Sequence, residues 1–147
     1  MLPKYYRFHV VNNTGQTATF NDGALLALRI SPWKFTSAGA VEYGTTITDD
    51  AGFDAGETIA DGAASEGGVN DNTSNLYVGL NGYFEATHDL DAAVGTWDLY
   101  IEGSDDNTNW PSDSDDFDLE IDLDMVRRMT IDNSAVDKSR AVNFTWE

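Results

Sequence analysis

Apolar and polar residues alternate along most of the 147-residue chain. A period of two is typical of β-strands, and we find no stretch with the spacing of an amphipathic helix. The alternation is strictest in "FDLEIDLDM", where one face would hold Phe117, Leu119, Ile121, Leu123 and Met125. In "TWDLYI" the residues Trp97, Leu99 and Ile101 share a face in the same way. The pattern therefore predicts an all-β protein.

The expected strands are short and are separated by turn-forming residues such as "NNTG" and "FNDG". We expect them over residues 5–11, 16–20, 24–30, 33–36, 41–48, 76–80, 83–88, 97–101, 117–125 and 142–146, with Pro32 ending the third. Many short strands joined in this way predict an antiparallel β-sandwich of the Ig-like or jelly-roll-like kind. The length fits a single domain over residues 1–147.

Residues 49–75 break the alternation. The segment "DDAGFDAGETIADGAASEGGVNDNTSN" is rich in glycine, alanine and aspartate and has few strand-forming residues. Connections of this length are uncommon unless they are functional or mobile. We therefore expect an excursion from the sandwich, an arm that becomes ordered on contact with a neighbouring subunit.

The charge is strongly negative, with 26 acidic against 8 basic residues and a net charge of −18. Such a surface repels phosphate groups, so we expect no nucleic-acid and no membrane partner. The chain has no cysteine, which excludes disulfides, thiol nucleophiles and cysteine-based metal clusters. Its opening lacks the apolar run of a signal peptide, so we expect synthesis and folding in the cytoplasm.

The basic residues lie close to the two ends of the chain. First and last strands often pair in sandwiches, so we expect these residues to gather on one side and to form a docking surface. The expected interface residues are Lys4, Arg7, Arg127, Arg128, Lys138 and Arg140, together with Trp110.

The loop after "TWDLYIE" holds the best candidates for a metal site, although no cofactor is expected. Its acids are Asp105, Asp106, Asp113, Asp115 and Asp116, and they do not follow the spacing of an EF-hand. A structural calcium ion is the most that they would hold. The acids of "FDLEIDLDM" cannot converge on one ion, because alternate strand residues are about 6.6 Å apart.

Enzymatic chemistry has little support in the sequence. His9 and His88 lack the paired spacing of zinc sites, and Ser104 is not part of a nucleophile elbow. Any two of the many carboxylates could be chosen as a glycosidase pair, so that signal has no specificity. We therefore expect a protein that is not an enzyme.

Trp110 lies in the same acidic loop, whose tip we expect to project beyond the sheet. Pro111 favours an extended conformation at Trp110. The indole would then either fold back over the sandwich as a lid or anchor a partner. A lid is the more common outcome for a large aromatic side chain.

The chain also carries a resemblance. The stretch "GTWDLYIEGSDDNTNWPSDSDDF", followed by "DMVRRMTIDNSAVDKSRAVNF", resembles small virion structural proteins of tailed bacteriophages, and so do "MLPKYYRF" and "ISPWKFTSAGAVEYG". The resemblance implies a capsid decoration (cement) protein that binds the major capsid protein on the outside of the head. It implies a homo-oligomer, expected to be a trimer, found in the host cytoplasm during assembly and then on the virion.

Two alternatives remain open. A tail or neck component would share the same resemblance. A carbohydrate-binding module belongs to a different class and would use Trp33, Trp97, Trp110 or Tyr100 as stacking platforms. Trp97 shares its face with Leu99 and Ile101 and is expected in the core.

Overall fold

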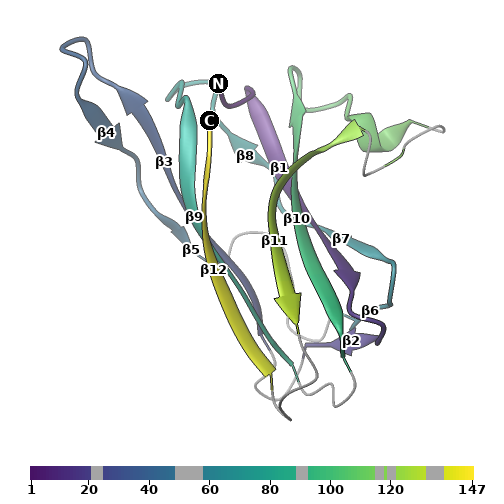
Figure 1. The fold of residues 1–147 in the computed structure, drawn as a ribbon. Helices are drawn as coiled ribbons and strands as arrows, with labels where there is room; N and C mark the ends of the chain where they lie inside the picture. The colour runs from purple at the N-terminus through teal and green to yellow at the C-terminus, as the bar shows by residue number, and fades with distance from the viewer. Residues whose placement is uncertain (21–24, 49–57, 89–92, 115–117, 119–121, 132–137) are drawn as a thin grey trace.

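Two antiparallel sheets pack face to face in the computed structural model (Figure 1). The structure describes residues 1–20, 25–48, 58–88, 93–114, 118, 122–131 and 138–147. The expected all-β sandwich is confirmed. Within these described residues, no helix has the length and apolar character needed to cross a membrane.

The first sheet has the strand order β11-β10-β1-β7, and β8 also pairs with β1. Its strands are β1 (Tyr5–Asn13), β7 (Ala64–Glu66), β8 (Asn70–Asp71), β10 (Gly95–Ser104) and β11 (Asp124–Ile131). The second sheet has the order β12-β9-β3-β4, and β5 also pairs with β3. Its strands are β3 (Leu25–Phe35), β4 (Val41–Tyr43), β5 (Ile47–Thr48), β9 (Gly79–His88) and β12 (Lys138–Trp146). A small ribbon joins β2 (Ala18–Thr19) to β6 (Thr58–Ile59).

The core lies between the two sheets and follows the alternation in the sequence. From the first sheet it takes Tyr6, Phe8, Val10, Trp97, Leu99, Ile101, Met129 and Ile131, and from the second Leu26, Leu28, Ile30, Leu80, Phe84 and Phe144. Val142 and Trp146 pack against it, as the pattern at the end of the chain predicts. Strands β11 and β12 lie side by side at one edge of the sandwich (Figure 1).

Pro32 does not end the third strand, contrary to our expectation. β3 runs through it, and Pro32 pairs with Leu80 of β9. The carbonyl of Pro32 accepts a hydrogen bond from the Gly44 N–H at 2.7 Å, so the missing N–H of the proline points toward the β4–β5 side. On that side the pairing of β3 is interrupted between β4 and β5, so the sheet tolerates the missing N–H of Pro32 there.

The part of the expected excursion over residues 49–75 that the structure describes pairs with strands of its own chain instead of leaving the sandwich as an arm. Residues 49–57 lie outside the described residues. Residues 58–59 form β6 and pair with β2, and the segment then runs along the first sheet, where β7 and β8 both pair with β1. The Gly67 N–H donates to Phe8 O at 2.8 Å and the Asn72 N–H to Lys4 O at 2.7 Å. Small and polar residues therefore order this segment through backbone hydrogen bonds, which the composition did not reveal.

The strand expected over residues 117–125 is also wrong where the structure describes it. The Asp122 N–H donates to Asp118 O at 2.8 Å, which closes a turn. The strand in this region is β11, which begins at Asp124, and Met125 is exposed rather than in the core. Leu123 is buried with Val11 and Tyr100 on the outer face of the first sheet.

Candidate functional site

The loop after β10 folds back over the outer face of the first sheet instead of projecting from it. Asp98, Tyr100 and Glu102 lie on that face of β10 and are all buried. A short 3₁₀ turn, η1 (Pro111–Asp113), follows Trp110 and brings the loop back toward the sheet. Both faces of β10 are therefore covered, one by the core and one by this loop.

Trp110 acts as a lid in this structure. Its side chain is only 8% exposed, and its ring lies over the guanidinium of Arg7 with 4.2 Å between Arg7 Cζ and the ring centroid. Arg7 is buried and reaches Glu102, Glu66 and Ser112. The expectation that Arg7 is a docking residue is thus corrected, because the charge of this side chain is used within the chain.

Glu102 is the centre of this network. Its Oε2 accepts hydrogen bonds from Arg7 Nε at 2.6 Å and from His9 Nε2 at 2.9 Å. Its Oε1 accepts the Ser112 N–H at 2.6 Å. Burial raises the pKa of Glu102, but the hydrogen bonds from Arg7, Ser112 and His9 outweigh burial and hold the pKa below its usual value. Both carboxylate oxygens are occupied, so the network fits a structural role.

The acidic loop uses its carboxylates to fix its own backbone. Asp106 Oδ1 accepts the N–H groups of Asn109 and Thr108, both at 2.9 Å. These two bonds and the Asn109 side chain lower the pKa of Asp106 to about 2. Asp105 faces Lys4 at 3.5 Å, and both side chains are exposed.

The structure gives a calcium site no support in the part of the chain that it describes. No three acidic or histidine side chains there are grouped as metal ligands. Asp113 is exposed on η1. Asp115 and Asp116 lie outside the described residues.

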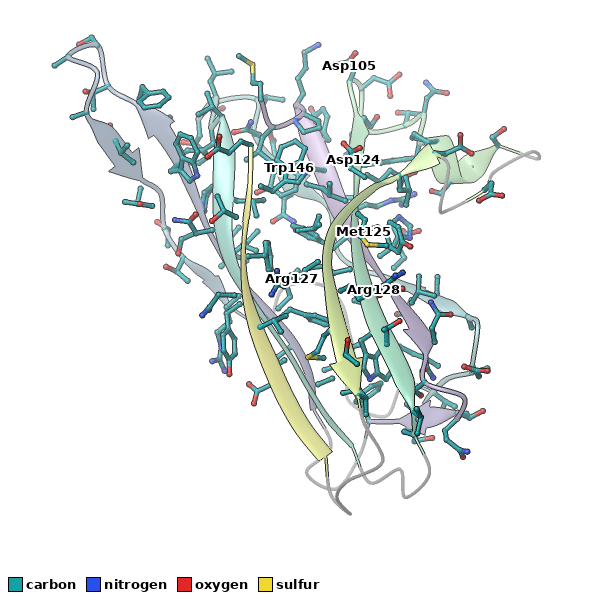
Figure 2. The ribbon with its side chains drawn as sticks, in the orientation of Figure 1. Asp105, Asp124, Met125, Arg127, Arg128 and Trp146 are labelled. Atoms are coloured by element: carbon teal, nitrogen blue, oxygen red, sulfur yellow. The ribbon has the colours of Figure 1, made fainter. Side chains whose placement is uncertain are left out.

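The remaining predicted interface residues lie on β11 and β12. Arg128 donates to the buried carboxylate of Asp98 through Nε at 2.7 Å and Nη2 at 2.8 Å. Arg127 is exposed, and Figure 2 shows it on the side of β11 that faces β12. Lys138 and Arg140 are the first and third residues of β12.

An aromatic surface lies on the outer face of the second sheet; the sequence offered Trp33 as a possible stacking platform, but its grouping with Phe35, Val41 and Tyr43 was not predicted. Tyr43 pairs with Trp33, and Val41 with Phe35, so all four side chains lie on one face of the β3–β4 hairpin. They border a hollow of about 310 Å³ lined by Trp33, Phe35, Val41, Tyr43, Asn81, Thr145 and Glu147. The spacing of "WKF" and "VEY" contains this signal, because alternate residues share a face.

Comparison with known proteins does not identify the chain: no family model, curated protein or solved structure matches it.

Proposed function

We propose that the chain is a non-enzymatic virion structural protein of a tailed bacteriophage, a capsid decoration protein that binds the outer shell as a trimer and stabilises it. The resemblance of residues 95–146 to such proteins supports the proposal, and so does the acidic β-sandwich body. A high net charge keeps a protein soluble at the concentrations that assembly requires.

One observation carries the docking mode. Arg127 and Arg128 lie on β11, Lys138 and Arg140 lie on β12, and these two edge strands are neighbours (Figure 1). We refer to these four residues as the basic strip. The strip brings four of the eight basic residues of a chain of net charge −18 onto two neighbouring strands. It would face an acidic region of the major capsid protein and steer the encounter.

Of the two strip residues whose side chains the structure describes, Arg127 is the better placed for a partner. It is exposed, and no other described residue forms an ion pair with it. Arg128 is needed by the buried carboxylate of Asp98, so reversing its charge would disturb the fold as well as docking. A test of docking should therefore change Arg127 and leave Arg128 in place.

The experiment is co-sedimentation with shells assembled from the major capsid protein of the same genome. Arg127→Glu should reduce occupancy, and added salt should weaken binding of the unchanged protein because exposed charges are screened beyond about 8 Å at physiological strength. Arg29→Glu is the matched control: it also changes the net charge from −18 to −20, but at an exposed residue of β3, away from the basic strip. Equal occupancy of the two variants would contradict this docking mode.

A tail or neck component would dock through the same strip. Purified heads and purified tails, offered separately in the same assay, distinguish the two positions. Binding to tails alone would replace decoration with the second role.

A further inference from the structure

The outer face of the second sheet leaves several large apolar side chains open to solvent. Phe35 and Tyr43 are each 58% exposed and Val41 is 50% exposed. They belong to the β3–β4 hairpin, which extends away from the sandwich in Figure 1. Scattered exposed apolar residues are normal, but a contiguous group beside a hollow marks a binding surface. We propose that this hollow binds a neutral polysaccharide chain, with Trp33 as the stacking platform.

The Trp33 indole packs directly against the backbone of Gly79. The two residues pair across β3 and β9. A Cβ atom at position 79 would lie 2.6 Å from Trp33 Cζ2 and 2.7 Å from Cε2, so the indole occupies the space that any larger residue would need. One side of the indole is therefore held against the sheet backbone. This close approach is possible only because residue 79 is glycine.

Phe35 holds the indole from a second direction. The rings of Trp33 and Phe35 are 5.4 Å apart between centroids and cross at 81°, an edge-to-face contact. The indole is thus positioned before any ligand arrives, and it lines the hollow. A rigid aromatic platform loses little conformational entropy on binding, which favours stacking with the apolar CH face of a sugar ring.

The hollow also provides the polar groups that sugar hydroxyls need. Asn81 from β9 and Thr145 from β12 lie beside the platform, and Thr145 Oγ1 donates to Asn81 Oδ1 at 3.1 Å. Glu147 adds a carboxylate that can accept hydrogen bonds from hydroxyl groups. A few polar groups around an aromatic wall are the usual composition of a small-ligand site, and about 310 Å³ is at the lower end of the usual range.

Charge selects among the possible ligands. A net charge of −18 disfavours anionic polysaccharides, nucleic acids and anionic lipid. An apolar protein surface over the hollow would bury Glu147 without a partner, which costs free energy. A neutral glycan supplies hydroxyl donors to that carboxylate instead. The inference does not depend on the proposed virion role, because the hollow and the basic strip involve different residues.

Native affinity electrophoresis of the full chain tests the inference. The gels contain one of four neutral polysaccharides (laminarin, hydroxyethylcellulose, galactomannan or dextran) or the anionic polymer alginate. We expect at least one neutral polymer to retard the protein. Trp33→Ala should weaken that retardation about tenfold or more, as expected for loss of a central aromatic anchor. Tyr43→Ala should weaken it as well, and its exposed position makes loss of folding a poor explanation.

Tyr83→Ala is the matched control. Tyr83 lies on β9, as Asn81 does, and its ring contacts Arg29, but it does not line the hollow. Retardation kept in this variant and lost in Trp33→Ala supports the site. The inference is overturned if no neutral polymer retards the unchanged protein, if only alginate does, or if Trp33→Ala is retarded as strongly as the unchanged chain. Loss of shell binding in Trp33→Ala without any polysaccharide binding would assign the surface to a protein contact.

Discussion

Replacing Trp110 with alanine tests whether the acidic loop is held on the outer face of the first sheet. The side chain is 8% exposed and stacks over Arg7. Truncating a buried tryptophan costs about 3 kcal/mol at the lower end of the observed range, and the lost cation–π contact lies within about 0.5–2 kcal/mol. Because Trp110 covers the sheet from outside rather than filling the central core, we expect a loss of about 3 kcal/mol in the free energy of unfolding.

Urea unfolding followed by circular dichroism measures this loss. Leu76→Ala is the control for an exposed apolar residue: its side chain is 68% exposed, and its replacement should change stability by less than about 0.5 kcal/mol. Each unfolding curve is repeated with EDTA, since stability lost only with the chelator would mean an ion bound by Asp105, Asp106, Asp113, Asp115 or Asp116.

A loss below about 1 kcal/mol for Trp110→Ala, with shell binding abolished, would refute the lid. Trp110 would then be an anchor for a partner, and the loop would be seated differently from the structure. Loss of shell binding only in proportion to unfolded protein is the result that the lid requires.

Three further predictions concern charge and the edge of the first sheet. Glu102 and Asp106 have pKa values below their unfolded values, so each stabilises the fold at pH values above its unfolded pKa and loses that contribution as the pH falls through its folded pKa, which for Asp106 is about 2; acid titration of unfolding should show this loss. Arg128→Met leaves the carboxylate of Asp98 without its bidentate partner and should lower the free energy of unfolding in urea by about 2 kcal/mol, less than for a fully buried pair because Arg128 is half exposed. Arg128→Lys should recover part of the lost stability. No loss in Arg128→Met would mean that the pair is not formed. Amides of residues 64–71 should be protected from hydrogen exchange in the isolated chain, and rapid exchange there would favour the mobile arm expected from composition.

The period of two was enough to predict the strands that carry the core, because each inward residue is determined by its immediate neighbours. Pro32 could not be placed in this way. Its effect depends on which side its missing N–H faces, and that is set by the interruption between β4 and β5. Residues 58–75 were misjudged for a related reason, because their order comes from hydrogen bonds to β1, far away in the sequence.

The network under Trp110 lay beyond sequence reasoning because its members are distant in the chain. Arg7 and Glu102 are 95 positions apart and meet only when β1 and β10 pair. A signal was present nonetheless: Val11 and Tyr100 are large apolar residues on the outer faces of two central strands, and apolar residues there indicate a cover. The aromatic hollow had a similar signal in "WKF" and "VEY", whose meaning depended on the unknown pairing of the two strands.

The four tryptophans occupy four different environments, so each can serve as a spectroscopic probe of a different part of the fold. Trp97 is sealed between the sheets, Trp110 lies beneath the folded loop, Trp33 borders the hollow, and Trp146 packs at the rim of the core near the C-terminus (Figure 2). Labelling with 5-fluorotryptophan would give one ¹⁹F resonance for each of these four environments. A glycan should then shift the Trp33 signal alone, release of the loop should shift the Trp110 signal, and global unfolding should move all four together.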